Sequence, residues 1–136
     1  MGTRRRAVLA AFVPALCALT WPVAGTTHVL AATEATMCSA DGTALQVTAE
    51  DNKFDKDCMA VPTDQAFTIS LENKDQGVPH NVSLYDTAHG NKALYQGEII
   101  YGPSKITYQV PGQAKGTYEF ISDPQAEIMR GTFIVG

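Results

Sequence analysis

From residue 45 onward the chain consists of short segments in which apolar and polar residues alternate. Val, Ile, Thr, Tyr and Phe are frequent in these segments, and Gly, Pro, Asn and Asp separate them. A period of two places successive side chains on opposite faces, as in half-buried β-strands, and no stretch has the period of an amphipathic helix. The sequence therefore predicts an all-β domain.

About seven strands are predicted, and turn-forming residues lie between them. The strands cover residues 45–49, 66–72, 80–85, 98–101, 105–110, 117–122 and 132–135. Short strands at this spacing are typical of a Greek-key β-sandwich. The chain has 136 residues, enough for one hydrophobic core and too few for two.

The N-terminal segment has the pattern of an export signal. Three arginines follow Thr3, and an almost uncharged apolar run covers residues 7–29. Small residues at 23–25 and at 30–32 offer two cleavage points, and the arginines are compatible with both the general secretory and the twin-arginine routes. We predict a signal peptide at residues 1–32 and a periplasmic, extracellular or cell-surface location in a bacterium.

Removal of the signal changes the cysteine count. Cys17 leaves with the signal, and Cys38 and Cys58 remain as an even pair. Cysteines in small exported domains usually form disulfides, and a bridge of this span stabilises a fold by about 3 kcal/mol in the chain-entropy model. Residues 33–44 are therefore predicted to be a leader that this disulfide ties to a domain at 45–136.

The predicted mature chain is acidic. The signal contains three arginines and no acidic residue, so seven basic and fourteen acidic residues remain, a net charge of about −7. This charge excludes nucleic acid as a partner. Pro14 and Pro22 interrupt the apolar run, which is a poor match to the ~20 apolar residues of a membrane span. We expect a monomer without a stable membrane span after cleavage.

Two segments carry the motifs of a known family. They are Val78-Pro79-His80-Asn81 and the closing run at residues 116–135, in which Tyr118, Phe120 and Asp123 precede Met129 and Gly131. Together with Phe54 they resemble the cupredoxins, small exported copper proteins, over residues 45–136. The family's closing motif is aromatic-x-aromatic-x-Cys-Asp-x-His followed by Met-x-Gly. The resemblance implies a cupredoxin sandwich in which one His and the Cys, His and Met of the closing loop bind a type 1 copper that carries single electrons.

Two of the four ligand positions differ from that pattern. His80 and Met129 match, whereas Ser122 stands in place of the Cys and Gln125 in place of the second His. A type 1 site needs a thiolate and two imidazoles in a trigonal plane with a weak axial ligand. A serine hydroxyl stays protonated at neutral pH, and an amide oxygen is a weak neutral donor. The ligand set therefore argues against a blue copper centre.

A different kind of metal site is an alternative. Asp123, Gln125 and Glu127 make the loop beside His80 rich in oxygen, which favours a hard or type 2 site. Binding of Cu(I) by His80 with Met129 is another alternative. The structural interpretation is that His80 is a hydrogen-bonded core histidine and that Met129 fills a gap in the packing.

The remaining candidates have a weaker basis. His89 lies in a turn, where an exposed histidine without a metal role is expected. Met37 and Met59 flank the predicted disulfide and would form a Cu(I) cluster only if they lay near Met129. Ser122 lacks the glycines of a nucleophile elbow, so a dyad with His80 has little support and we predict no enzymatic activity.

Three hypotheses for the function follow. The first is an exported, metal-free binding or structural module with an envelope protein as its partner. The second is a weak, non-blue copper binder that uses His80 with Met129 or Glu127. The third is the copper-binding electron carrier that the family resemblance implies, with a redox protein as its partner. Copper is the only cofactor that we consider, and none is expected if the site is fully lost.

Overall fold

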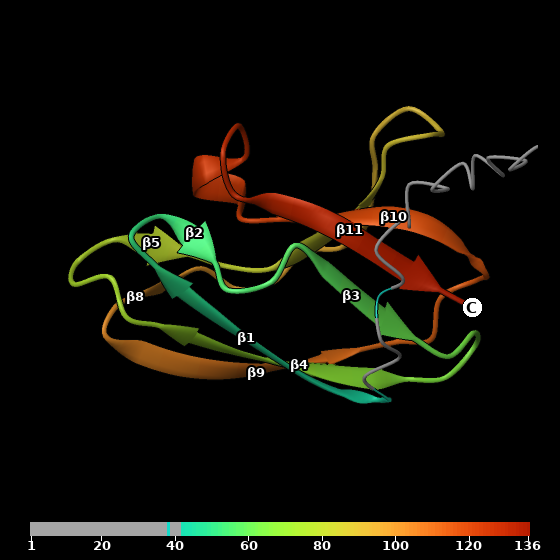
Figure 1. Ribbon diagram of the computed structural model, residues 1–136, viewed down its shortest axis with the longest axis horizontal. Coiled ribbons are helices and arrows are strands. Elements are labelled where there is room, and N and C mark those ends of the chain that lie inside the picture. The colour runs from blue at the N-terminus through green and yellow to red at the C-terminus, as the bar shows by residue number, and fades with distance from the viewer. Residues whose placement is uncertain (1–37, 39–41) are drawn as a thin grey trace, which may run out of the picture. The chain divides into compact units, whose positions relative to one another are not determined.

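The computed structural model describes Cys38 and residues 42–136, which form β-strands joined by loops (Figure 1). The predicted signal at residues 1–32 lies outside the described residues, as does most of the predicted leader at 33–44. The described part contains eleven strands and one 3₁₀ turn, η1(Asp123–Gln125). No helix in that part is long and apolar enough to cross a membrane. The prediction of an all-β domain is confirmed.

Nine of the strands form two sheets. The first sheet has the order β2-β1-β4-β9 and the second the order β3-β11-β10-β6-β7. The bounds in the first sheet are β2(Lys53–Phe54), β1(Ala44–Glu50), β4(Phe67–Asn73) and β9(Ser104–Val110). The bounds in the second are β3(Cys58–Val61), β11(Arg130–Val135), β10(Gly116–Ile121), β6(Ser83–Asp86) and β7(Lys92–Tyr95). Pairs β1–β4 and β3–β11 are parallel and the other pairs are antiparallel, which gives the mixed sheets of the predicted sandwich.

The two sheets enclose one apolar core. In β4 every second residue is buried, as the alternation predicted. Two aromatic pairs join the sheets: the ring centroids of Phe67 and Phe133 lie 5.4 Å apart, and those of Phe54 and Phe120 lie 5.3 Å apart. Such pairs contribute about 0.5–1.5 kcal/mol beyond the burial of their area. The second pair anchors the short strand β2 to β10.

The strand predicted at residues 80–85 is two strands in the structure. His80 belongs to β5(Pro79–His80), which pairs with β8(Ile100–Tyr101), whereas Ser83 opens β6 and pairs with β10. Between them, the side chain of Asn81 donates a hydrogen bond of 2.8 Å to the carbonyl oxygen of Gly97. Side-chain bonds of this kind compete with the ladder of a regular strand. The break therefore separates His80 from the second sheet.

Three strands were not predicted, one predicted strand is shorter than expected, and another ends one residue earlier than expected. Strand β2 has only two residues, β3 is buried at three of its four positions and so does not alternate, and β7 is a partly exposed edge strand. Only Ile100 and Tyr101 remain of the strand predicted at 98–101. Strand β10 ends at Ile121, and Ser122 precedes the 3₁₀ turn as its N-cap.

Cys38 and Cys58 form a disulfide, and their Cα atoms lie 5.5 Å apart. Cys58 begins β3, which is an edge strand of the second sheet. The bridge that the cysteine count predicted is therefore present in the structure. It holds residue 38 beside that edge of the sheet.

Gly131 in β11 leaves no space for a side chain, which gives the first testable prediction. A Cβ atom there would overlap the ring of Phe120 and lie 2.7 Å from the carbonyl oxygen of Asp57. We expect Gly131→Ala to lower the free energy of unfolding by about 1–3 kcal/mol, measured by urea denaturation, because the site becomes overpacked. Gly136→Ala is the matched control, since a Cβ at Gly136 meets no atom within 4 Å. Equal stability of the two variants would contradict the prediction.

Candidate functional site

The candidate site lies where β5 meets the loop that joins β10 to β11. His80 comes from β5, and Ser122, Gln125 and Met129 come from the loop, which includes η1. His80 and Ser122 are 0% exposed and Met129 is 1% exposed. The backbone N–H of Ser122 donates to the carbonyl oxygen of Met129 at 2.9 Å, which closes the base of the loop. The structure thus brings together the four positions that the family motif singled out.

Both ring nitrogens of His80 lie within hydrogen-bond distance of a side-chain oxygen. Nδ1 is 2.8 Å from Oε1 of Gln125, and Nε2 is 2.8 Å from Oδ2 of Asp75. The hydroxyl of Ser122 donates to the same Oε1 at 3.1 Å and lies 3.4 Å from Nδ1. A metal ion at His80 would therefore have to displace the side chain of either Gln125 or Asp75.

Asp75 connects His80 to the turn between β1 and β2. Its carboxylate accepts the backbone N–H groups of Asp51 at 2.7 Å and Asn52 at 2.9 Å, two residues with φ angles of 55° and 54°. Burial by itself would raise the pKa of Asp75, but the N–H of Asn52, the His80 imidazole and the N–H of Asp51 outweigh it and lower the pKa below 3.8. This role was not predicted, because the sequence around Asp75 indicates only a turn.

A second polar cluster surrounds Asp123 at the start of η1. Its carboxylate accepts hydrogen bonds from Asn81 at 2.7 Å, from the Tyr85 hydroxyl at 2.8 Å and from the Ser83 hydroxyl. Its backbone N–H donates to the side-chain oxygen of Asn81 at 2.8 Å. A hydrogen bond from Gln96 favours the ionised phenol, but burial and the Asp123 carboxylate raise the pKa of Tyr85 above 10.0. These bonds hold the loop against β6, and the Asp123 carboxylate faces that strand.

The other candidates do not join this site. Glu127 is exposed, and its side chain makes no hydrogen bond or ion pair within the described residues. His89 is 80% exposed and lies 2.8 Å from the carboxylate of Asp86. Met59 is buried in the core, and Met37 lies outside the described residues. Among the residues that the structure describes, no three His, Cys, Asp or Glu side chains are grouped to hold a metal ion.

The donor set does not fit a type 1 copper. Ser122 offers a hydroxyl and Gln125 an amide where the family motif has a thiolate and an imidazole. Cys58 cannot substitute, because its sulfur is bonded to Cys38. His80 is the one imidazole at the site, and both of its nitrogens already have partners.

The chain belongs to the cupredoxin-like domain family, whose model matches residues 13–135. A comparison with curated protein sequences finds no relative.

Among solved structures, reduced auracyanin from the photosynthetic bacterium Roseiflexus castenholzii is similar, with a TM-score of 0.61 and 19% identity over 72% of this chain and 99% of that one. Auracyanin A, a "blue" copper protein from Chloroflexus aurantiacus, has a TM-score of 0.61 and 20% identity over 70% of this chain and 99% of that one. An oxidised mutant of amicyanin has a TM-score of 0.51 and 25% identity over 68% of this chain and 82% of that one. These likenesses confirm the cupredoxin sandwich.

The cluster around Asp123 gives a second prediction. Asp123→Ala would leave the polar groups of Asn81, Ser83 and Tyr85 without their shared acceptor. Because a buried polar group that loses its partner costs about 1–3 kcal/mol, we expect the free energy of unfolding to fall by at least that amount in urea denaturation. Glu127→Ala, in the same loop, is the control and should change stability by less than about 0.5 kcal/mol. A loss in Asp123→Ala no larger than in the control would show that the cluster is not stabilising.

The lowered pKa of Asp75 gives a third prediction, on pH dependence. Because the ionised carboxylate is favoured in the folded state, its stabilisation is present above a pH of about 4 and is lost as the pH falls through the folded pKa. We therefore expect Asp75→Asn to be less stable than the natural chain at neutral pH, with a difference that shrinks on acidification. Urea denaturation at several pH values measures this difference. A difference that stays constant down to low pH would contradict the prediction.

Proposed function

We propose that this protein is an exported binding module built on the cupredoxin fold, and that it does not carry electrons on a type 1 copper. The observation that carries the proposal is the pairing of both His80 nitrogens, with Gln125 on one side and Asp75 on the other. Ser122, at the position of the thiolate, supports the same hydrogen-bonded arrangement by donating to Gln125.

The satisfaction of the buried polar groups supports the proposal. Within the described residues, no buried side-chain nitrogen or oxygen lacks a hydrogen-bond partner. A site built for a metal leaves donor atoms directed at the ion, and without the ion such atoms cost about 1–3 kcal/mol each when buried. Here Gln125 connects His80 and Ser122 directly. The loop therefore holds its shape through its own side chains.

Weak, non-blue copper binding is compatible with the geometry only if a hydrogen bond of His80 is broken. A copper ion at His80 must break the bond to Gln125 or to Asp75, and Met129, a soft candidate ligand in the same loop as Gln125, is 1% exposed. Glu127 lies exposed in the loop. We expect any copper uptake at this site to be weak.

Ser122, His80 and Asp75 also form a chain of side chains of the kind found in serine hydrolases, but their setting does not support catalysis. The Ser122 hydroxyl is 3.4 Å from Nδ1, whereas the Gln125 oxygen is closer, at 2.8 Å. Ser122 and His80 are both 0% exposed, so a substrate carbonyl has no access to the hydroxyl. We propose that the protein is not an enzyme.

The proposed location is outside the cytoplasm, in the periplasm, at the cell surface or in the medium of a bacterium. The predicted signal at residues 1–32 supports this location. The Cys38–Cys58 disulfide also supports it, because such bonds persist in oxidising compartments. The proposed partner is a protein of the same compartment, and the protein itself is proposed to be a monomer.

Copper titration tests the absence of a type 1 centre. We expect the purified protein, titrated with Cu(I) and Cu(II) against a competing chelator, to show no tight one-to-one binding and no thiolate-to-copper absorbance, because the thiolate is missing. His80→Ala is the control and should behave as the natural chain does. Stoichiometric binding that His80→Ala abolishes would refute the proposal and make His80 a ligand.

The double variant Ser122→Cys with Gln125→His tests whether the loop still has cupredoxin geometry. We expect this variant to develop a coloured centre with Cu(II), because the His80 ring lies at both changed positions and the backbone of Met129 is hydrogen-bonded to both. Gln125→His alone, which lacks the thiolate, should stay colourless. If the double variant folds and remains colourless, the loop positions do not correspond to those of the family's copper site.

A further inference from the structure

A hollow with basic and apolar walls lies beside the candidate site, since Met129 also lines it. It has a volume of about 260 Å³ and is bordered by β2, the loop after β2, and the end of the loop that leads into β11. Five of the residues that line it form what we call the basic-apolar surface: Lys53, Phe54, Lys56, Ile128 and Arg130. The hollow is open to solvent, unlike the buried hydrogen bonds of His80.

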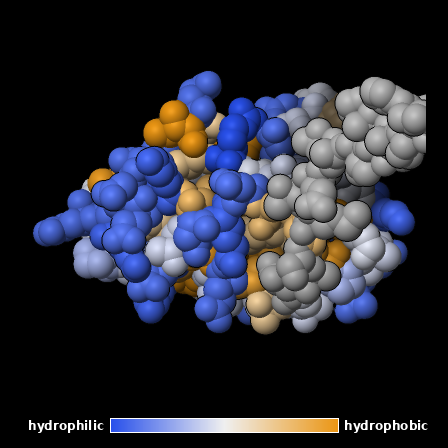
Figure 2. All heavy atoms as spheres, in the orientation of Figure 1, coloured by the Kyte–Doolittle hydropathy of each residue, from blue (hydrophilic) through white to orange (hydrophobic). Residues whose placement is uncertain are grey.

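The apolar part of this surface centres on Ile128. Its side chain is 68% exposed, the largest exposed fraction among the large hydrophobic residues that the structure describes as exposed. The backbone N–H of Ile128 donates to the carbonyl oxygen of Gln125 at 3.0 Å, so the residue sits on an ordered turn. Phe54 is half-buried below it. Figure 2 shows a hydrophobic area over η1 with hydrophilic atoms on either side of it.

The polar part carries more positive than negative charge. Lys53, Lys56 and Arg130 line the hollow, and Asp57 is the one acidic residue that does so. These three are among only seven basic residues that follow the predicted signal. Arg130 forms an ion pair with Glu119, whereas Lys53 and Lys56 form none within the described residues. The lining of this hollow therefore holds three basic residues against one acidic residue, with Arg130 paired to Glu119, on a chain that is acidic as a whole.

We propose that the basic-apolar surface binds an acidic segment of a partner protein in which an apolar side chain lies next to carboxylates. The apolar side chain would contact Ile128 and Phe54, and the carboxylates would pair with Lys53 and Lys56. The inference rests on the proposed function as a binding module and names the chemistry of its partner. A contact of this size belongs to the weak, transient class of interfaces.

A narrow peptide segment fits the charges around the hollow better than an extended anionic surface does. Glu50, Asp51 and Asp55 line the adjoining hollow on the other side of Lys53 and Phe54. A wide anionic surface such as a lipid bilayer would meet these carboxylates as well. Like charges that come close together repel each other, because salt at physiological ionic strength largely screens only charges that are more than about 8 Å apart. A single acidic strand can contact the lysines and avoid the carboxylates.

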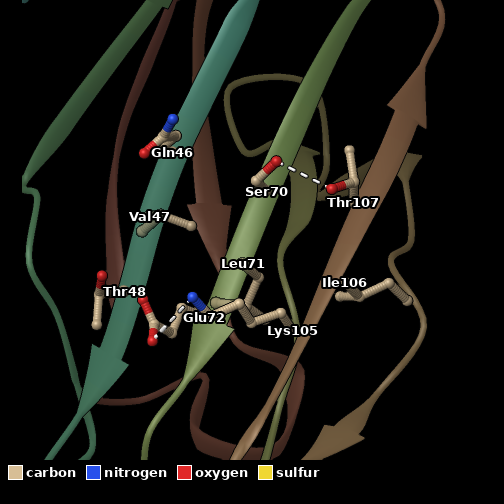
Figure 3. A pocket seen from close by; sticks show the side chains of 9 residues that line it. All are labelled: Gln46, Val47, Thr48, Ser70, Leu71, Glu72, Lys105, Ile106 and Thr107. Atoms are coloured by element: carbon tan, nitrogen blue, oxygen red, sulfur yellow. Dashed lines mark hydrogen bonds and ion pairs between the residues drawn. The ribbon is translucent and has the colours of Figure 1, made fainter.

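The groove shown in Figure 3 is a weaker candidate for the same role. It lies on the outer face of the first sheet, where Ser70 bonds to Thr107 at 3.0 Å and Glu72 pairs with Lys105 at 3.2 Å. Four of its polar side chains are thus paired, and Lys105 is neutralised by its neighbour. Unlike this groove, the basic-apolar surface has two lysines without an ion pair among the described residues and an exposed apolar residue, Ile128.

A peptide titration followed by amide chemical shifts in NMR tests the proposal. The probe is the acidic pentapeptide Glu-Leu-Asp-Leu-Glu, and the reference is its neutral counterpart Gln-Leu-Asn-Leu-Gln, both added to the purified protein with EDTA present. We expect shifts near residues 53–57 and 128–130, and an affinity for the acidic peptide about tenfold above that for the neutral one. Equal affinities, or shifts elsewhere, would overturn the proposal.

Variants with a matched charge change separate this surface from the net charge. Lys53→Glu with Lys56→Glu should weaken binding of the acidic peptide by about tenfold or more. Lys92→Glu with Lys115→Glu makes the same change away from the surface and should alter binding less than about twofold. Ile128→Ser should weaken binding several-fold through loss of apolar contact. An equal loss in the two charge variants would overturn the proposal, as would binding to phosphatidylglycerol vesicles without binding to the peptide.

The peptide titration and the copper titration can succeed or fail independently of each other. Because EDTA removes free metal, peptide binding is measured without copper. Tight copper uptake together with peptide binding would refute only the expectation that copper binds weakly at His80. Absence of both would refute the partner chemistry proposed here and leave the interpretation of the His80 site standing.

Discussion

Polar groups buried at the end of a β-sandwich must find partners inside the protein, and the arrangement of this one depends on that constraint. His80, Asn81, Ser83 and Ser122 are all buried where β5 and β6 meet the closing loop. The carboxylates of two residues and the side-chain amide of a third are their hydrogen-bond partners. Asp123 serves the side toward β6, and Asp75 and Gln125 serve the imidazole. The course of the loop follows from the bonds of Gln125 and Asp123, which fix these two loop residues against β5 and β6.

In this member of the cupredoxin-like family, the fold supports membership of the family, whereas the site residues argue against a shared function. The fold depends on the alternation of apolar residues and on the aromatic pairs between the sheets, and neither of these involves the ligand positions. Substitutions at Ser122 and Gln125 therefore leave the sandwich intact while they change the chemistry at its end. A shared fold supports membership of the family, whereas a shared function requires the residues of the site as well.

The sequence predicted the sandwich and the identity of the site positions because both are local properties. Alternation is visible within a few residues, and the closing motif is nearly contiguous. Two-residue strands such as β2 carry too little pattern to be found. The partners of His80 are a different case, since Asp75 lies five residues away and Gln125 forty-five. Which of several acidic or amide residues reaches the ring depends on turns that place distant segments together.

The closed loop also bears on how the protein reaches its final form. Where a metal completes a site, the last step of maturation depends on the supply of that metal and on its delivery to the right compartment. In the metal-free protein that we propose, the residues that close the loop are encoded in the chain, so folding and one disulfide between Cys38 and Cys58 would complete the structure. The abundance of the finished protein would then follow its synthesis and oxidation, and would not vary with the copper content of the surroundings.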